Sequence, residues 1–214
     1  MISIRTLGYG LAFIFFSIGV AGLGSVALDI GKSVLAAPLL DRAFSKAQST
    51  GIPQKPWSWA DHTVIGQLTF EATSETITTL DSGGMRAMAF APVSYPQGSA
   101  VVLVAHRDTH FKSLKSLRLG DTLHYQKIGQ RKRRYEVADT WIADKDQLYL
   151  PEGGYTAGLL LITCYPFDKA EAGGRQRLLV WAPEVDPEVD PEIVMRSAQT
   201  AAKPPLNRQK APAG

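Results

Sequence analysis

The chain has 214 residues, a formal net charge of +3, 45% hydrophobic residues and 9% aromatic residues. This length fits one folded domain with accessory segments, and the hydrophobic content is that of a chain that buries a core. The only dense basic run, 131–134, is expected to be the solvated turn of a hairpin. No aromatic side chains interleave it to stack on bases, so nucleic acid is not expected as a partner.

The N-terminus carries the first strong signal. No charged residue occurs from Thr6 to Leu28, and this segment is long enough to cross a hydrocarbon core of about 30 Å at about 1.5 Å per residue. Residues 1–28 are therefore expected to form a membrane anchor with one transmembrane helix and the N-terminus in the cytoplasm. A cleaved signal peptide is the alternative, although its apolar core is usually shorter. Either way, the rest of the chain is expected to be exported.

A connector over 29–56 is compatible with a helix from Val34 to Ala47 and then contains helix-breaking Gly and Pro residues. The folded domain is expected over 57–184. Trp57 and Trp59 at its start are expected to be core residues, with a membrane-proximal belt as the alternative. Short strand-like segments between turn signals predict a mainly β fold, an eight-stranded closed or nearly closed β-barrel with short helices. The expected strands are 64–70, 75–81, 86–90, 100–107, 122–128, 134–143, 158–165 and 177–182. A short helix is expected over 111–119, and the Pro- and Lys-rich tail over 185–214 is expected to be disordered.

Cys164 is the only cysteine. It ends the apolar run 159–163, which fits a buried strand, and Pro166 follows to stop the strand. A free cysteine often acts as a small buried hydrophobe, and that interpretation stays open. Outside the cytosol, however, an unpaired thiol is exposed to oxidation and mispairing, so a retained single cysteine is a candidate reactive thiol.

A cysteine nucleophile acts as a thiolate and needs a basic or cationic neighbour. Of the four histidines, His106 is the best candidate, because it ends the apolar run 101–105 as Cys164 ends its own. His110 lies in the same loop and is the second candidate. The His106-x-x-x-His110 spacing also fits a pair of zinc ligands on a helix, but no glutamate accompanies it and the segment leaves a strand. No metal and no cofactor is therefore expected.

An arginine near the thiol would stabilise an oxyanion, because a guanidinium is always charged and offers several donors. Arg175 and Arg177 follow Cys164 after a loop that lets the chain turn back. Arg177 opens the last strand, which is expected to pair beside the cysteine strand, so Arg177 is preferred.

Taken together, three stretches resemble the sortases, membrane-anchored cysteine transpeptidases: 105–111 (AHRDTHF), 161–167 (LITCYPF) and 177–180 (RLLV). The stretch 57–61 (WSWAD) is similar to the domain entry of class D and proteobacterial sortases. The resemblance implies an eight-stranded sortase barrel in which Cys164 is the nucleophile, His106 the acid/base and Arg177 the donor to the oxyanion or substrate backbone. It further implies substrate contacts from Thr163 and His110. Leu160 and Ala105 stand where the family usually has threonine and glycine.

The resemblance also implies the partners. The expected substrate is a secreted protein with an LPxTG-like C-terminal signal, cleaved between threonine and glycine through a Cys164 thioester and passed to an amine acceptor. The expected location is the bacterial inner membrane, with the catalytic domain on the extracytoplasmic side. Two alternatives stay open: an exported cysteine peptidase in which water resolves the thioester, and a membrane-tethered β-barrel binding module with an inert thiol. The Ser-His-Gly-Cys type of motif found in L,D-transpeptidases does not occur.

Overall fold

The computed structural model describes residues 35–81, 84, 86–97, 99–148, 157–168, 174–185 and 209–210. The chain divides into two compact units, Met1–Leu39 and Leu40–Gly214. Of the first unit, only residues 35–39 are described, as the start of a helix over 35–50. The predicted membrane segment Thr6–Leu28 lies outside these ranges. Among the residues that the structure describes, no helix has both the length and the apolar character needed to cross a membrane.

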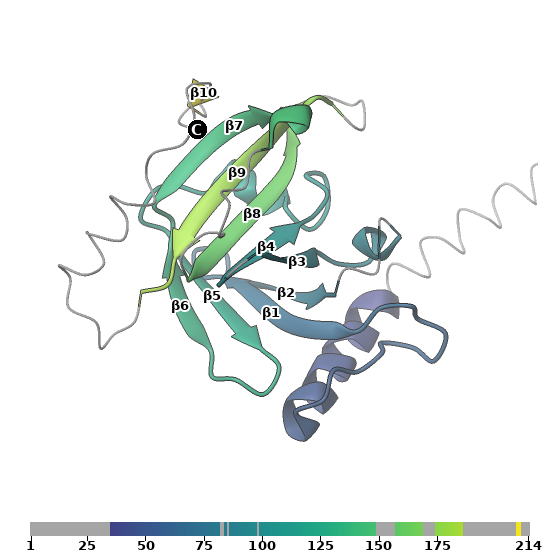
Figure 1. Ribbon diagram of the computed structural model, residues 1–214. Coiled ribbons are helices and arrows are strands. Elements are labelled where there is room, and N and C mark those ends of the chain that lie inside the picture. The colour runs from purple at the N-terminus through teal and green to yellow at the C-terminus, as the bar shows by residue number, and fades with distance from the viewer. Residues whose placement is uncertain are drawn as a thin grey trace, which may run out of the picture. The chain divides into compact units, whose positions relative to one another are not determined.

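The second unit is built on one curled sheet (Figure 1). Its strands lie in the order β10-β7-β9-β8-β4-β3-β2-β1-β5-β6. Neighbouring strands are antiparallel except for β2 with β3 and β4 with β8, which are parallel. The strands are β1 Val64–Phe70, β2 Glu75–Leu80, β3 Val93–Gln97, β4 Ala100–Val104, β5 Thr122–Lys127, β6 Arg133–Glu136, β7 Asp139–Asp144, β8 Gly158–Tyr165, β9 Gln176–Pro183 and β10 Gln209–Lys210.

The sheet curls until β6, at one end, approaches β9, near the opposite end. Tyr135 on β6 forms an isolated antiparallel bridge with Glu184, just past β9, and the Val185 N–H donates to the Arg134 carbonyl at 2.9 Å. The concave side holds the main core, to which β1, β4, β5, β8 and β9 all contribute. A smaller apolar cluster covers the opposite face of β4, β7, β8 and β9. β4 and β8 are apolar on both faces because both of their faces are buried, as is usual for parallel neighbours.

The prediction of a mainly β barrel with short helices is confirmed, but the strand count is wrong. The described residues contain nine strands, β1–β9, and the two-residue β10, where eight were expected. Residues 86–90 are not a strand: Ala87–Ala89 form the 3₁₀ helix η1. The following loop instead holds β3. The predicted strand 134–143 is two strands, β6 and β7, and the predicted helix 111–119 shrinks to the 3₁₀ helix η2, Lys112–Lys115.

The connector is helical over 35–50, as predicted in outline. Within the second unit, this helix is fixed to the sheet by polar contacts. Thr78 on β2 donates to the Asp41 carboxylate at 2.8 Å, and Gln48 donates to the Lys127 carbonyl at 3.0 Å. Trp57 contacts the rings of His62 and Phe90, whereas Trp59 is 83% exposed, so the expectation of a core position is wrong for Trp59.

The predicted disordered tail over 185–214 lies outside the described residues, apart from Val185 and β10. β10 pairs with β7 through Gln209↔Ile142 and Lys210↔Trp141.

Candidate active site

Cys164 and His106 occupy equivalent places on neighbouring strands. β4 and β8 run parallel with Val104 level with Ile162. The ladder continues past β4, because the Ala105 N–H donates to the Ile162 carbonyl at 3.2 Å. His106 and Cys164 are each two residues beyond the Val104–Ile162 pair. The register therefore brings the start of the His106 loop to the same edge of the sheet as Cys164.

Arg177 lies on the strand on the other side of Cys164, and the three candidate residues Cys164, His106 and Arg177 are called the candidate row below. β9 is antiparallel to β8, and Arg177 is the direct cross-strand partner of Cys164. Because side chains alternate along a strand, Cys164 shares a face with Ile162, and Arg177 shares that face with Leu179. Ile162 and Leu179 belong to the smaller apolar cluster. Cys164 and Arg177 thus extend one face of β8 and β9, and His106 follows the end of the adjacent β4.

The candidate row is open to solvent. His106 is exposed, while Cys164 and Arg177 are half-buried. The Cys164 thiol is free. A half-buried thiol at the end of a buried strand has a fixed base and an accessible tip, as nucleophilic attack requires.

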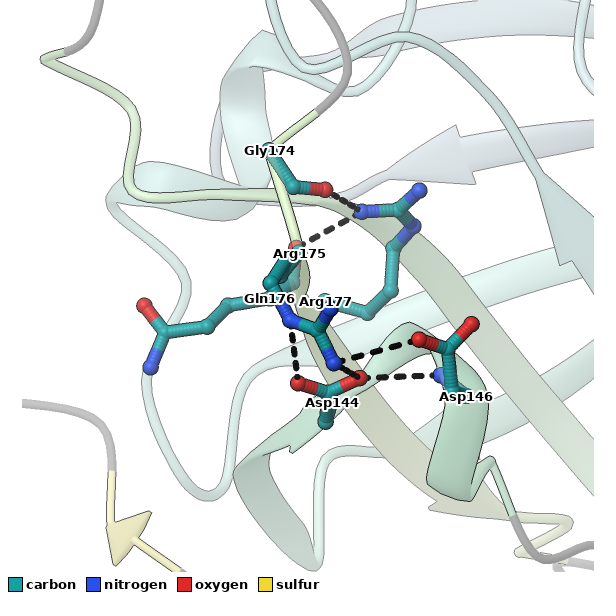
Figure 2. A network of polar contacts seen from close by, with 6 residues as sticks. All are labelled: Asp144, Asp146, Gly174, Arg175, Gln176 and Arg177. Carbon is teal, nitrogen blue, oxygen red and sulfur yellow. Dashed lines mark hydrogen bonds and ion pairs between the residues drawn. The ribbon is translucent and has the colours of Figure 1, made fainter.

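The two arginines after Cys164 have different surroundings (Figure 2). The Arg175 guanidinium is turned toward Asp144 and Asp146 and bonds each carboxylate at 3.1 Å. Nη1 of Arg177 instead reaches back to the backbone carbonyls of Gly174 and, at 2.9 Å, Gln176. Within the described residues, Nε and Nη2 of Arg177 have no hydrogen-bond partner, so these donors remain available to a ligand.

The loop that carries His106 is anchored to the main core. Phe111 is fully buried in the main core, and its N–H donates to the His106 carbonyl at 3.1 Å. His110 lies in the same turn. Burial lowers the pKa of His110, the neighbouring His106 lowers it further, and a hydrogen bond with the Ala89 backbone opposes this shift. Nε2 of His110 is buried without a hydrogen-bond partner in the described structure, so this nitrogen does not face solvent.

The Thr163 side chain points to the face of β8 opposite Cys164. It is 1% exposed, and its hydroxyl donates to the Ala105 carbonyl at 2.8 Å. The residue before the candidate nucleophile is thereby bonded to the residue before the candidate base. The predicted substrate contacts of Thr163 and His110 stay predictions.

Sequence reasoning missed Arg107. This residue is 2% exposed, and its Nη1 donates to the Pro166 carbonyl at 2.7 Å. A charged residue in a polar loop gives no sequence signal of burial. Its position directly after a candidate catalytic histidine was the only sequence feature that could have indicated a role in the site. Over the described ranges, no three His, Cys, Asp or Glu residues are grouped as metal ligands.

Comparison with known proteins identifies the family. A family model for the sortase domain matches residues 61–185. Similar solved structures include sortase C1 of Streptococcus agalactiae in complex with MTSET (21% identity, 58% of this chain and 69% of that chain, TM-score 0.48) and Streptococcus pneumoniae sortase C (19% identity, 57% and 67%, TM-score 0.49). A lid mutant of Corynebacterium diphtheriae sortase A is 18% identical over 74% of this chain and 97% of that chain, with a TM-score of 0.49. The comparison with curated proteins found no significant match. Since the family model covers more than half of the chain, this chain belongs to the sortase family of cysteine transpeptidases.

Proposed function

We propose that this sortase cleaves an LPxTG-like C-terminal sorting signal between threonine and glycine and transfers the threonine acyl group to an amine. Cys164 is the nucleophile, His106 the acid/base and Arg177 the oxyanion donor. The observation that carries the proposal is the arrangement of three neighbouring strands: Arg177 is paired with Cys164 across β9 and β8, and His106 follows the end of β4, which runs beside β8. Adjacent strands lie about 4.8 Å apart, so side chains from three such strands can reach one peptide bond.

In the first step, the Cys164 thiolate attacks the threonine carbonyl carbon and forms a C–S bond. The carbonyl oxygen becomes an oxyanion, and the Arg177 guanidinium stabilises its charge. As the intermediate collapses, the C–N bond to glycine breaks and His106 donates a proton to the leaving amine. The product is a thioester between threonine and Cys164.

In the second step, an incoming amine attacks the thioester carbon and His106 accepts a proton from it. The C–S bond breaks, the thiolate leaves, and a new amide bond links the substrate to the acceptor. The thioester conserves the activation of the acyl group, so no further energy source is needed. The acceptor is an amine of a cell-wall precursor or of another protein.

Two other outcomes remain open. In a cysteine peptidase, water would resolve the thioester, and product analysis with and without an added amine separates the two reactions. In a binding module, Cys164 would be inert. The rate of alkylation of Cys164, followed against pH, tests that alternative, because a pH-independent and very slow reaction would favour it.

The cellular setting is also part of the proposal. The apolar segment Thr6–Leu28 anchors the enzyme in a bacterial inner membrane and places the catalytic domain outside the cytoplasm. The WSWAD stretch at 57–61 supports assignment to the class D or proteobacterial sortases. Membrane fractionation, followed by protease treatment of spheroplasts, would test the anchor and its orientation together.

The decisive experiment uses the full-length protein in detergent micelles with a library of LPxTG-related peptides and an amine acceptor. Mass spectrometry should detect a peptide thioester on the wild type and none on Cys164→Ala. His106→Asn should lose turnover, whereas the matched variant His124→Asn should keep it, because His124 lies on β5 beside Glu71. Peptide cleavage by Cys164→Ala would refute the mechanism.

A further inference from the structure

Hydrogen bonds join the ends of β4 and β8 both before and after the candidate catalytic pair. On the strand side, the Thr163 hydroxyl donates to the Ala105 carbonyl at 2.8 Å. These two residues directly precede Cys164 and His106. This bond therefore fixes the two loops relative to each other just before the reactive groups.

Arg107 makes the corresponding connection after them. Its Nη1 donates to the Pro166 carbonyl at 2.7 Å, between residues 59 positions apart in the sequence. Nε of the same guanidinium lies 3.3 Å from the Asp108 carboxylate, within the histidine loop. Arg107 directly follows His106, and Pro166 is two residues after Cys164. Arg107 thus joins the segment after His106 to the segment after Cys164.

The burial of this guanidinium is energetically significant. Removing a cation from water is costly, and a chain retains one inside only where hydrogen bonds and counter-charges compensate. Arg107 is 2% exposed and meets both conditions. The guanidinium is planar with donors in a fixed fork, so it holds two acceptors at set angles as a lysine cannot. Its loss would also leave the Pro166 carbonyl without this donor.

An exposed ion pair also joins these two parts of the chain, but it differs in kind from the Arg107–Pro166 hydrogen bond. Lys115 Nζ lies 2.7 Å from the Asp168 carboxylate, and the two side chains are 60% and 81% exposed. Such exposed pairs contribute little, because water and salt screen them and two long side chains must be ordered. Lys115 is therefore a natural control for Arg107.

We propose that Arg107 is a positioning residue that holds His106 within proton-transfer reach of the reacting centre on Cys164. The inference rests on the proposed function, in which these two residues carry the chemistry. His106 is exposed and its loop leaves the sheet, so strand pairing alone does not fix the loop beyond Ala105. The Arg107–Pro166 bond supplies that constraint. Misplacement of a catalytic group by about 1 Å can cost about a hundredfold in rate.

The test compares Arg107→Lys, Arg107→Gln and the control Lys115→Met in full-length protein. Arg107→Lys keeps the positive charge but loses the fixed geometry of the guanidinium donors. If Arg107→Gln does not fold, Arg107→Lys alone tests the positioning role. For each variant, kcat and KM are measured with the sorting peptide and an amine, thermal unfolding reports the fold, and iodoacetamide at alkaline pH reports the accessibility of Cys164. We expect kcat of Arg107→Lys to fall by about tenfold to a hundredfold. KM and the alkaline alkylation rate should stay near those of the wild type, and Lys115→Met should match the wild type throughout.

Three results would overturn the inference: a folded Arg107→Lys with wild-type kcat, a rise in KM with kcat unchanged, or an equal loss of kcat in Lys115→Met. The Cys164→Ala variant separates this failure from a failure of the proposed function. If Cys164→Ala is active, the mechanism itself is wrong. If Cys164→Ala is inactive while Arg107→Lys is fully active, only the positioning role is wrong.

Discussion

Cys164 on β8 and Arg177 on β9 are direct partners in an antiparallel pair. In such a pair the Cβ atoms are about 4.5–5.5 Å apart and both side chains point to the same face. This pairing is a consequence of the β8–β9 register, which runs unbroken from Gly158↔Pro183 to Tyr165↔Gln176. A slip by one residue would turn Arg177 to the opposite face, so the buried residues that fix this register also fix the site.

Arg177→Ala should lower kcat/KM by about a hundredfold to a thousandfold, as the loss of one oxyanion donor typically does. Arg177→Lys should restore little of this loss. A single ammonium cannot both bond the Gln176 carbonyl and face the substrate in the geometry that the guanidinium adopts. Steady-state kinetics with the sorting peptide and an amine provide the measurement.

Arg175→Ala is the matched control for Arg177→Ala, since its guanidinium is bound to Asp144 and Asp146 instead. Its kcat/KM should remain far closer to that of the wild type. An equal loss in the two folded variants would show that the wrong arginine has been chosen.

Thr163→Val should reduce the free energy of unfolding by about 1–3 kcal/mol, because the buried Ala105 carbonyl would lose its donor. Thr163→Ser keeps the hydroxyl and should be less destabilised. Chemical denaturation of both variants gives the comparison, and the reverse order would mean that the methyl group matters more than the hydrogen bond. KM values of the same variants test whether Thr163 also affects substrate binding.

The sequence could predict the candidate row because each of its members lies at or just past one end of a recognisable strand. The apolar runs before His106 and Cys164 are buried on both faces, so few alternative placements exist for them. Arg177 opens the next strand, and a hairpin-like return makes that strand a neighbour. Three short segments were therefore enough to predict that these strands are neighbours, while the catalytic roles of His106, Cys164 and Arg177 stay predictions.

Other elements depended on tertiary partners that the sequence does not reveal. The strand predicted over 134–143 breaks where the chain changes partners: the Val137 N–H donates to Asp121, beside β5, whereas the Ala138 N–H donates to Trp181 on β9. Tyr135, Val137 and Trp141 fit a single two-residue period across this corner, so periodicity alone gives one strand. No strand was expected over β3, because Pro92, Pro96 and Gly98 favour a loop there. It pairs with β2 only at Leu80↔Val93, so among the described residues that side of β3 has no ladder beyond Val93 and tolerates a proline.

Asp144 and Arg175 should be energetically coupled. Asp144 Oδ1 accepts the Asp146 N–H and caps the 3₁₀ helix η3, Lys145–Gln147, while Oδ2 accepts from Arg175. These bonds lower the pKa of Asp144, the one from the Asp146 backbone most. A lowered carboxyl pKa stabilises the fold above the ordinary value near 3.8, and this contribution is lost as the pH falls through the folded-state pKa.

A double-mutant cycle with Asp144→Asn and Arg175→Gln measures this coupling. The two single variants should each lower Tm, and the double variant should be less destabilised than the sum of both. Because the Arg175 side chain is 69% exposed and that of Asp144 is 29% exposed, solvent reaches the pair and added salt should weaken the coupling. Additive effects that do not respond to salt would show that the cluster contributes no interaction energy.

His110 should make the fold less stable in mild acid. Burial holds the folded-state pKa of His110 below its ordinary value of 6.5, while the unfolded chain titrates near that value. Above pH 6.5 the residue is neutral in both states and contributes no pH dependence. As the pH falls through 6.5, the unfolded state binds the proton first, so the free energy of unfolding decreases until the folded-state pKa is passed.

His110→Gln removes this proton-linked term and keeps a polar side chain of similar reach. The variant can differ from the wild type by a constant amount at every pH, because the buried contacts of the ring are also lost. The informative quantity is therefore the slope. From pH 8 down to pH 5, the unfolding free energy of the wild type should fall more steeply than that of His110→Gln, as measured by urea denaturation at each pH. Parallel curves would mean that His110 accepts its proton equally well in the folded and unfolded chain, contrary to its burial against the Ala89 backbone and beside His106.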